Sequence, residues 1–173
     1  HLLKRFVAHS NLMRNNPLES ARAKVDRANY HLERLKERIH SDGNNKAYGI
    51  SFRHESQTNE LVIKALIPRE LFVQYAVSAG EVIGQARSAL EHAIWDMVPS
   101  PPVEREREIG FPVFRRETKH PTEKGYYERD GLRKIDGINP AAETLIRGLQ
   151  PFGPDYETKL LYILNQLWNR DKH

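Results

Sequence analysis

Apolar residues recur at helical spacing over the first long stretch of the chain. From about Ser20 to His40 they repeat every three or four positions, at Ala21, Val25, Ala28, Leu32, Leu35 and Ile39. This spacing predicts an amphipathic helix, with Ser20 as its N-cap and the Asp42-Gly43 turn as its end. A similar pattern before Pro17 predicts a shorter helix with four buried side chains, Leu2, Leu3, Phe6 and Val7.

The period of the pattern changes to two after this helix. Tyr48, Ile50 and Phe52 alternate with small or polar residues, and residues 61–67 are mostly apolar. A polar segment, 54–60, separates the two runs, so a β-hairpin is predicted over about 46–67. Because two strands alone are marginally stable in water, we expect the hairpin to pack on helices or to meet another strand.

Helical spacing returns from about Arg69 to Val98, directly after Pro68, a residue that suits the first turn of a helix. Gly80 and Gly84 interrupt this long helix at a cost of roughly 1 kcal/mol each relative to Ala. Their spacing of four residues leaves a smooth strip along one face. We therefore predict that another helix packs closely against this strip.

The rest of the chain alternates irregular and helical segments. Residues 99–137 show no regular period and are predicted as an irregular basic loop. Pro140 then starts a helix that runs to about Leu149, and a final helix begins near Asp155. The predicted fold class is mainly α: a helical bundle of four to five helices with one inserted β-hairpin, forming a single domain over 1–173.

Composition indicates a globular protein without narrowing its function. A chain of 173 residues with 39% hydrophobic and 29% charged residues can bury one core. No apolar run approaches the roughly 20 residues of a membrane-spanning helix, so we expect no membrane partner. The absence of cysteine excludes disulfides and thiol catalysis, and it fits a reducing cytoplasm. A net charge of +4 permits contact with nucleic acid without requiring it.

Common catalytic and metal-binding signatures are missing from the sequence. It contains no G-x-x-x-x-G-K phosphate loop, no G-x-G-x-x-G, no G-x-S-x-G and no H-E-x-x-H. Its eight histidines include no pair spaced three or four residues apart. We therefore expect neither a metal nor a cofactor.

The strongest candidate for chemistry is Arg87-Ser-Ala-Leu-Glu-His92, within the long helix. An arginine followed by a histidine after four to six residues, on a helix of an all-α bundle, resembles the HEPN family of nucleotide-binding domains. The resemblance implies a homodimer that binds RNA or cleaves it as a metal-independent endoribonuclease, in a toxin or phage-defence setting with a protein partner such as an antitoxin. It also implies that His92 acts as the general acid or base while Arg87 holds the scissile phosphate.

A structural interpretation of the same motif stays open. Arg87 shares one helix face with three apolar residues, Ile83, Leu90 and Ile94. A guanidinium inside an apolar stripe needs a partner, and Glu91, one turn later, is the nearest one. On this interpretation Arg87 and Glu91 form an ion pair, and His92 hydrogen-bonds within the core or a subunit interface.

The most basic stretch of the chain runs from Arg115 to Lys134. Cations interleaved with aromatic rings suit a single-stranded nucleic acid, whose phosphates need charge and whose bases need stacking partners. The predicted nucleic-acid-binding residues are Arg115, Arg116, Lys119, Lys124, Tyr126 and Tyr127. Because four acidic residues are mixed with them, a solvated loop is the alternative interpretation.

A polar cluster ends the chain. Asn169, Asp171 and His173 fall within about two helical turns, and we predict that they support the Arg87 region together with Glu91. A polar helix end without a functional role is the alternative.

Four segments together resemble a group of uncharacterised bacterial proteins of similar size: 87–95, 111–114, 149–152 and 167–173. This resemblance implies a helical bacterial protein and brings no activity with it. The alternative function is therefore a non-catalytic helical module for interaction or oligomerisation.

Overall fold

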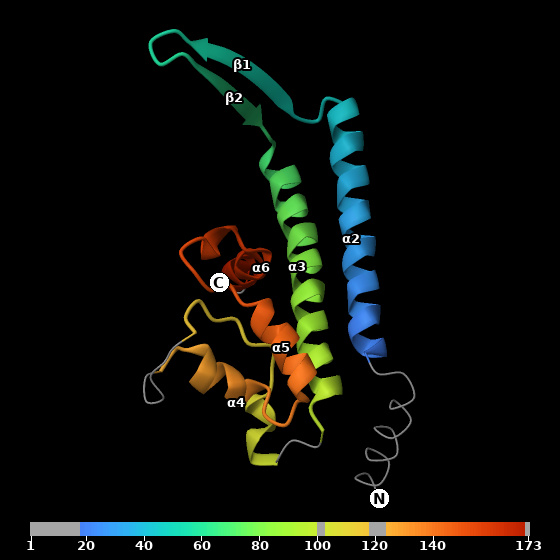
Figure 1. Ribbon diagram of the computed structural model, residues 1–173. Helices are drawn as coiled ribbons and strands as arrows, with labels where there is room; N and C mark the ends of the chain where they lie inside the picture. Colours follow the sequence, from blue (N-terminus) through green and yellow to red (C-terminus); the bar gives the residue numbers. More distant parts are fainter. Residues whose placement is uncertain (1–17, 100–102, 118–123, 172–173) are drawn as a thin grey trace, which may run out of the picture.

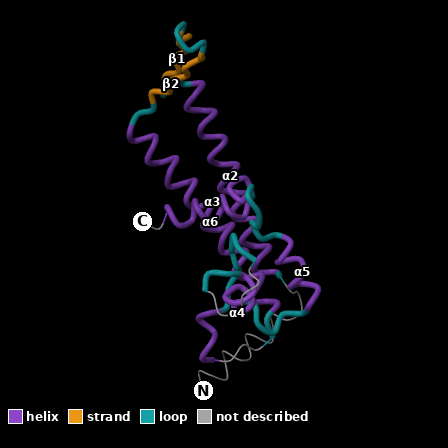
Figure 2. Tube along the Cα trace, turned by 60° about the vertical axis from the view of Figure 1, so that its left-hand side comes forward, coloured by secondary structure: helices purple, strands orange, loops and turns teal. Residues whose placement is uncertain are grey.

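A computed structural model describes residues 18–99, 103–117 and 124–171. The described chain is mainly helical with one antiparallel hairpin, which confirms the predicted helical bundle with an inserted β-hairpin. A long pair of helices carries the hairpin at one end and is joined by shorter helices toward the other (Figures 1 and 2). The short helix predicted before Pro17 lies outside the described residues.

Helices α2 (Glu19–Asn44) and α3 (Arg69–Met97) form the long antiparallel pair. The predicted seam of α2 is confirmed at Ala21 and Ala28, which are buried, whereas Val25 remains 47% exposed. The prediction of Ser20 as the N-cap is wrong. Leu18 holds that position with a φ of 73°, and the Ser20 hydroxyl instead donates a hydrogen bond to Asp96 Oδ2 of α3 over 3.1 Å.

The hairpin lies where the sequence predicts it, between these two helices. Strand β1 (Gly49–Glu55) pairs with strand β2 (Glu60–Leu66), and Phe52 stands directly opposite Ile63. The expectation that the hairpin packs on helices is not met. Every strand residue is exposed except Glu55 and Val62, which are half-buried.

The core surrounds the C-terminal half of α3. Its buried side chains come from α3, from the segment that follows it and from α5, and they are Ile94, Val98, Ile109, Phe111, Tyr127, Ile135 and Ile146. Helix α5 (Pro140–Gly148) starts at the predicted proline, and Asn139 caps it by accepting the Ala142 N–H over 2.9 Å. The burial of residues 109–111 fixes the extended segment that leads to the basic stretch.

Helix α6 (Leu160–Asp171) packs against α3 at the two glycines, which confirms the predicted strip. A Cβ atom at Gly84 would lie 3.4 Å from the Trp168 ring, and one at Gly80 would lie 2.5 Å from an Asp171 carboxylate oxygen. The predicted start of this helix near Asp155 is wrong. Residues 156–158 form a separate 3₁₀ turn, and the extended ψ of 128° at Lys159 divides it from α6.

The region predicted as irregular, 99–137, contains short turns of helix. A 3₁₀ turn spans Val103–Glu108, and a π-helical turn over Tyr127–Gly131 runs into α4 (Leu132–Lys134). The extended residues 109–117 lie between these two elements. This extended segment positions the candidate site.

Candidate nucleic-acid interface

Side chains from the core hold the extended segment 111–116 by its backbone. The Gln150 side-chain amide is 4% exposed, and its Oε1 accepts the Phe114 N–H over 3.0 Å. Its Nε2 donates to the Pro112 carbonyl over 3.0 Å. The Tyr127 N–H in turn donates to the Arg116 carbonyl over 3.0 Å. These bonds fix the direction in which the following basic residues leave the core.

Arg87 and Glu91 hold the same segment at its start. The Arg87 guanidinium lies 2.5 Å from Glu91 Oε1 and donates to the Phe111 carbonyl over 3.0 Å. Glu91 Oε2 accepts the Phe111 N–H over 2.8 Å. The ion pair that the structural interpretation proposes is therefore present, and it also binds both polar backbone groups of the buried Phe111. The Arg87 side chain is 12% exposed, and its Nη1 atom is buried without a hydrogen-bond partner.

His92 lies on a different side of α3 from Arg87. Five residues at about 100° each separate the two by roughly 140° on the helix surface. Asp96, one turn after His92, bonds to Ser20 of α2, so His92 faces α2 and is half-buried there. Within one chain, the structure does not bring the two predicted catalytic side chains to one surface.

Three of the predicted nucleic-acid-binding cations meet in one surface hollow of about 390 Å³, which we call the basic hollow. Arg115 and Arg116 line it from the extended segment, and Lys124 lines it from the start of the next described segment. Helix α6 contributes further lining residues. The described lining contains three cations and no carboxylate, and it consists of Val113, Phe114, Arg115, Arg116, Lys124, Gly125, Tyr162, Asn165 and Gln166.

Aromatic rings stand against both arginines. The Arg115 guanidinium lies 5.0 Å from the centre of the Tyr156 ring, which meets Tyr162 edge-on at 4.9 Å. Arg116 lies 5.7 Å from the centre of the half-buried Tyr126 ring. Guanidinium groups at these distances are attracted by the ring faces while their N–H groups remain able to bind anions. The hollow thus combines cations with aromatic surface.

The neighbouring acidic residues are bound elsewhere. Arg147 donates to Glu117 over 2.6 Å and to Glu128 over 2.9 Å. These bonds raise the pKa of Arg147 above its ordinary value, and the bond to Glu117 has the largest effect. Asp130 accepts the Gly125 N–H over 2.5 Å. Glu117, Glu128 and Asp130 are therefore bound away from the described cations of the hollow, and the fourth acid of the stretch, Glu123, lies outside the described residues.

Tyr127 is not part of this surface, and its prediction as a nucleic-acid contact is wrong. The side chain is fully buried and meets Phe152 edge-on with ring centres 5.7 Å apart. Burial, assisted by the negative charge of Glu143, raises the pKa of Tyr127 to about 12. Its neighbour Tyr126 stays at the surface because consecutive residues at the start of the π-helical turn point in different directions.

The predicted supporting residues are only partly tested by the geometry. Asp171 lies over Gly80, about two turns of α3 before Arg87, and Asn169 is exposed. Lys119 and His173 lie outside the described residues. The two α6 residues nearest the basic hollow that the sequence did not single out are Tyr162 and Gln166. With Asn165 they share one helix face at i, i+3 and i+4, and that spacing is the only sequence signal for them.

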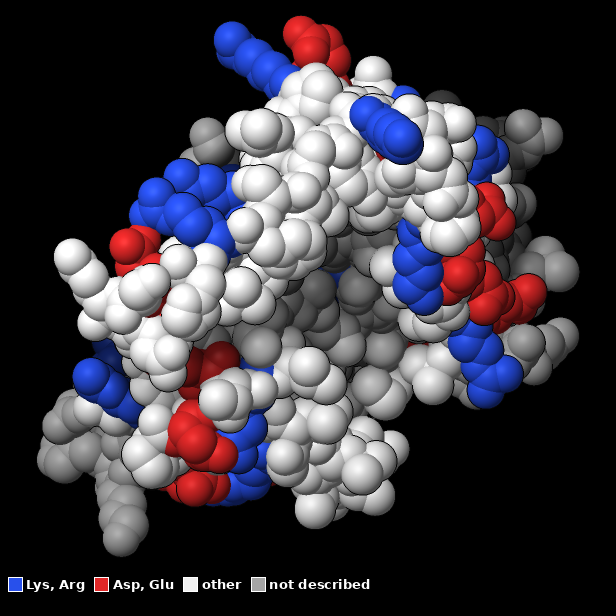
Figure 3. Space-filling model, turned by 90° about the horizontal axis from the view of Figure 1, so that it is seen from above, with Lys and Arg blue, Asp and Glu red and all other residues white. Residues whose placement is uncertain are grey.

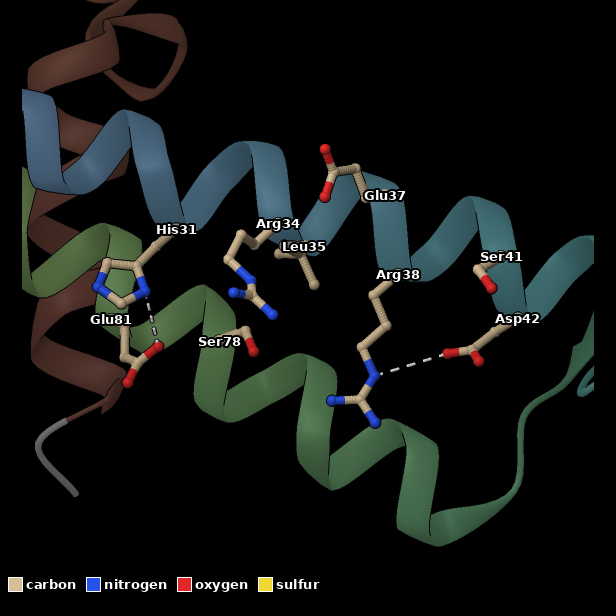
Figure 4. Close-up of a pocket in the computed structure, with 9 residues that line it drawn as sticks. All are labelled: His31, Arg34, Leu35, Glu37, Arg38, Ser41, Asp42, Ser78 and Glu81. Carbon is tan, nitrogen blue, oxygen red and sulfur yellow. Dashed lines mark ion pairs between the residues drawn. The ribbon is translucent and has the colours of Figure 1, made fainter.

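A second pocket, of about 500 Å³, lies between α2 and α3 (Figure 4). His31 Nδ1 lies 3.0 Å from Glu81, and the Arg38 Nε atom lies 3.7 Å from Asp42. Ser78 also lines the pocket, but the second nitrogen of His31 points away from it. The first of these contacts joins α2 to α3 and the second lies within α2, and among the described lining residues no nucleophile is linked to a base.

The part of the chain that the structure describes lacks two further features. It contains no group of three or more His, Asp or Glu side chains able to hold a metal ion. None of its helices is long and apolar enough to cross a membrane.

Comparison with known proteins returned no relative. No family model matches the chain, and neither a curated protein nor a solved structure does.

Proposed function

We propose that this protein binds single-stranded RNA through the basic hollow. The observation that supports the proposal is the convergence of Arg115, Arg116 and Lys124 on one concave surface whose described lining has no carboxylate. Phosphate contacts of this kind supply most of the affinity of nucleic-acid binding. A pocket of about 390 Å³ also lies within the size range of sites for small ligands, so one nucleotide unit can enter it.

The other groups in and beside the hollow favour a single strand over a duplex. Phe114 and Tyr162 line it and offer aromatic surface on which an unpaired base can stack, while Tyr126 and Tyr156 stand against its two arginines. Asn165 and Gln166 each carry a donor and an acceptor, which can bond to a base edge or to a ribose 2′-hydroxyl. Bases in a duplex are already stacked and paired, and they cannot reach such a surface.

The resemblance of the Arg87–His92 motif to the HEPN family supports RNA as the ligand. Arg87 acts in this proposal as a positioning residue, because it holds Phe111 at the start of the segment that presents Arg115 and Arg116. Its role as a catalytic residue beside His92 stays a prediction. A nuclease site built from both side chains would need a second chain to join them.

The binding proposal is tested with a short fluorescent polyuridine strand and fluorescence anisotropy over a salt series. Removing two cations from the hollow, by Arg115→Gln with Arg116→Gln, should weaken binding about a hundredfold at low salt, since a charge-assisted hydrogen bond contributes roughly 1.5–3 kcal/mol. The slope of log affinity against log salt should fall by about 1.4, at roughly 0.7 per lost phosphate contact.

The matched control is Arg133→Gln with Lys134→Gln. It removes the same charge from the same stretch, but Arg133 bonds to Glu108, and neither residue lines the hollow. The control should keep affinity within a few-fold of wild type. Equal losses of affinity in both double variants would indicate that the total charge of the protein, and not the hollow, determines binding. The absence of binding by the wild type would refute the proposal.

Cleavage is measured in the same samples with excess chelator. If the HEPN resemblance extends to activity, RNA is cut without metal, and His92→Ala abolishes cutting while it leaves affinity unchanged. Intact RNA in every sample, with normal affinity, would leave binding as the function and remove the nuclease prediction.

A further inference from the structure

One face of the hairpin is apolar and uncovered. Residues directly opposite each other on paired strands share a face, so Ile50, Phe52, Leu61 and Ile63 lie together. Their exposed fractions are 55%, 67%, 62% and 60% in the same order. Taking roughly 200 Å² for the surface of a large apolar side chain, the four leave about 500 Å² of apolar surface in water.

The opposite face is mixed. It carries two apolar side chains, Val62 and Leu66, among five polar ones, Ser51, Arg53, Glu55, Glu60 and Lys64, and Arg53 pairs with Glu55. Strand β1 alternates between apolar and polar residues from Ile50 to Arg53, a pattern typical of a sheet with one covered face. In the described part of the chain, no helix packs on either face of the hairpin. The covering element is therefore missing from the single described chain.

The adjoining turns of α3 carry further exposed apolar side chains. Phe72, Val73 and Val77 are 61%, 50% and 61% exposed. They bring the exposed apolar area at this end to roughly 800 Å², which is the area that one partner contributes to a standard protein interface. Seen from the hairpin end, uncharged surface covers much of the molecule, with groups of Lys, Arg, Asp and Glu side chains at several points on and around it (Figure 3).

We propose that the apolar hairpin face is a homodimer interface, on which a second copy of this chain stacks its own hairpin face to face. A patch that pairs with itself about a two-fold axis must not repel itself. This face meets that condition, because His54 at its tip is its only ionisable residue. A basic or acidic partner would find no complementary charge on it, whereas an identical apolar face buries both surfaces. Stacked sheets of this kind lie about 10 Å apart.

The interface is tested by two charge insertions at neighbouring positions of β2. Ile63→Lys places a charge at the centre of the apolar face, whereas Val62→Lys places the same charge one residue earlier, on the opposite face across from Arg53. Sedimentation of the full chain over a micromolar concentration series should give a dimer for the wild type and for Val62→Lys. Ile63→Lys should be monomeric, with its association weakened a hundredfold or more.

Cysteine probes keep the test independent of the stability of those variants. The chain has no cysteine, so Ile63→Cys and Val62→Cys each introduce a single thiol. A bismaleimide linker of about 10 Å should join two copies of Ile63→Cys and leave Val62→Cys uncrosslinked, as expected from the distance between stacked sheets.

Three outcomes would overturn the proposal: a wild type that stays monomeric, equal disruption by both lysines, or crosslinking through Val62→Cys alone. The last outcome would indicate pairing at the strand edge. RNA affinity per chain should be unchanged in Ile63→Lys, so failure of the dimer and failure of the RNA proposal are distinguishable.

Discussion

Gln150→Leu should destabilise the protein more than any other polar-to-apolar change of similar size in the described chain. The Gln150 amide is 4% exposed and makes three hydrogen bonds, to Phe114 N–H and to the Pro112 and Ile146 carbonyls. Leucine has a similar volume, so packing changes little. What changes is the pairing of two backbone groups, one in a part-buried and one in a buried hydrogen bond.

The expected loss follows from counting those groups. The Ile146 carbonyl also accepts the Leu149 N–H over 3.2 Å, so it keeps a partner in the variant. The Phe114 N–H and the Pro112 carbonyl lose the partner that Gln150 gives them. Each polar group left unpaired in the interior costs about 1–3 kcal/mol, so the loss of two partners should lower the free energy of unfolding by about 2–6 kcal/mol. That is a large share of the roughly 5–15 kcal/mol of a typical domain.

Urea unfolding followed by circular dichroism measures this difference. The matched control is Gln74→Leu, because Gln74 is an exposed helical residue whose amide meets Arg38 at the surface. Its free energy of unfolding should stay within about 0.5 kcal/mol of wild type. A Gln150→Leu variant as stable as the control would show that the bonds to segment 112–114 are not needed to hold it. The account of how the basic hollow is positioned would then be wrong.

Two further changes test the core beside the hollow. Gly131→Ala should lower the free energy of unfolding by about 1–3 kcal/mol, because the new Cβ would lie 2.7 Å from the buried Tyr127 ring. Gly148→Ala has nothing within 4 Å of its new Cβ and should stabilise α5 by up to about 1 kcal/mol. Thermal unfolding of both variants measures these two changes. Tyr127→Phe should be neutral or stabilising below pH 10, because it removes a buried hydroxyl that has no partner. Since the pKa of Tyr127 is about 12 when folded and about 10 when unfolded, the wild type loses stability of order 1–2 kcal/mol as pH rises from 10 to 12. Urea titrations at several alkaline pH values should show that loss in the wild type and a smaller one in Tyr127→Phe, and parallel curves would contradict the assignment.

The long elements could be predicted because their patterns are local. Helices α2 and α3 and the hairpin between them follow directly from the periods of apolar residues, which act over a few positions. Errors arose where a tertiary contact overrode a local preference. Ser20 is a good N-cap residue, yet its hydroxyl bonds to Asp96 of another helix. The extended backbone at Lys159 separates the 3₁₀ turn from the last helix, and no local sequence pattern predicts this break.

Only part of the candidate site could be predicted from the sequence. Arg115, Arg116 and Lys124 stood out by charge, and the structure does bring them together. Tyr127 stood out equally but is buried, because the direction of a side chain in an irregular segment depends on what packs against the segment. The wall formed by Tyr162 and Gln166 could not be assigned, since nothing local indicates that α6 crosses beside residues 113–116.

The position of Arg87 also decides how mutational data on its motif should be interpreted. The Arg87–Glu91 pair binds the two backbone groups of Phe111, and Phe111 starts the segment that carries Arg115 and Arg116. Loss of Arg87 therefore disturbs the hollow as well as any chemistry at Arg87 itself. A drop in RNA affinity or cleavage after Arg87→Ala does not identify a catalytic residue. His92 is the informative half of the motif, because it lies on the other side of α3 and takes no part in holding the segment.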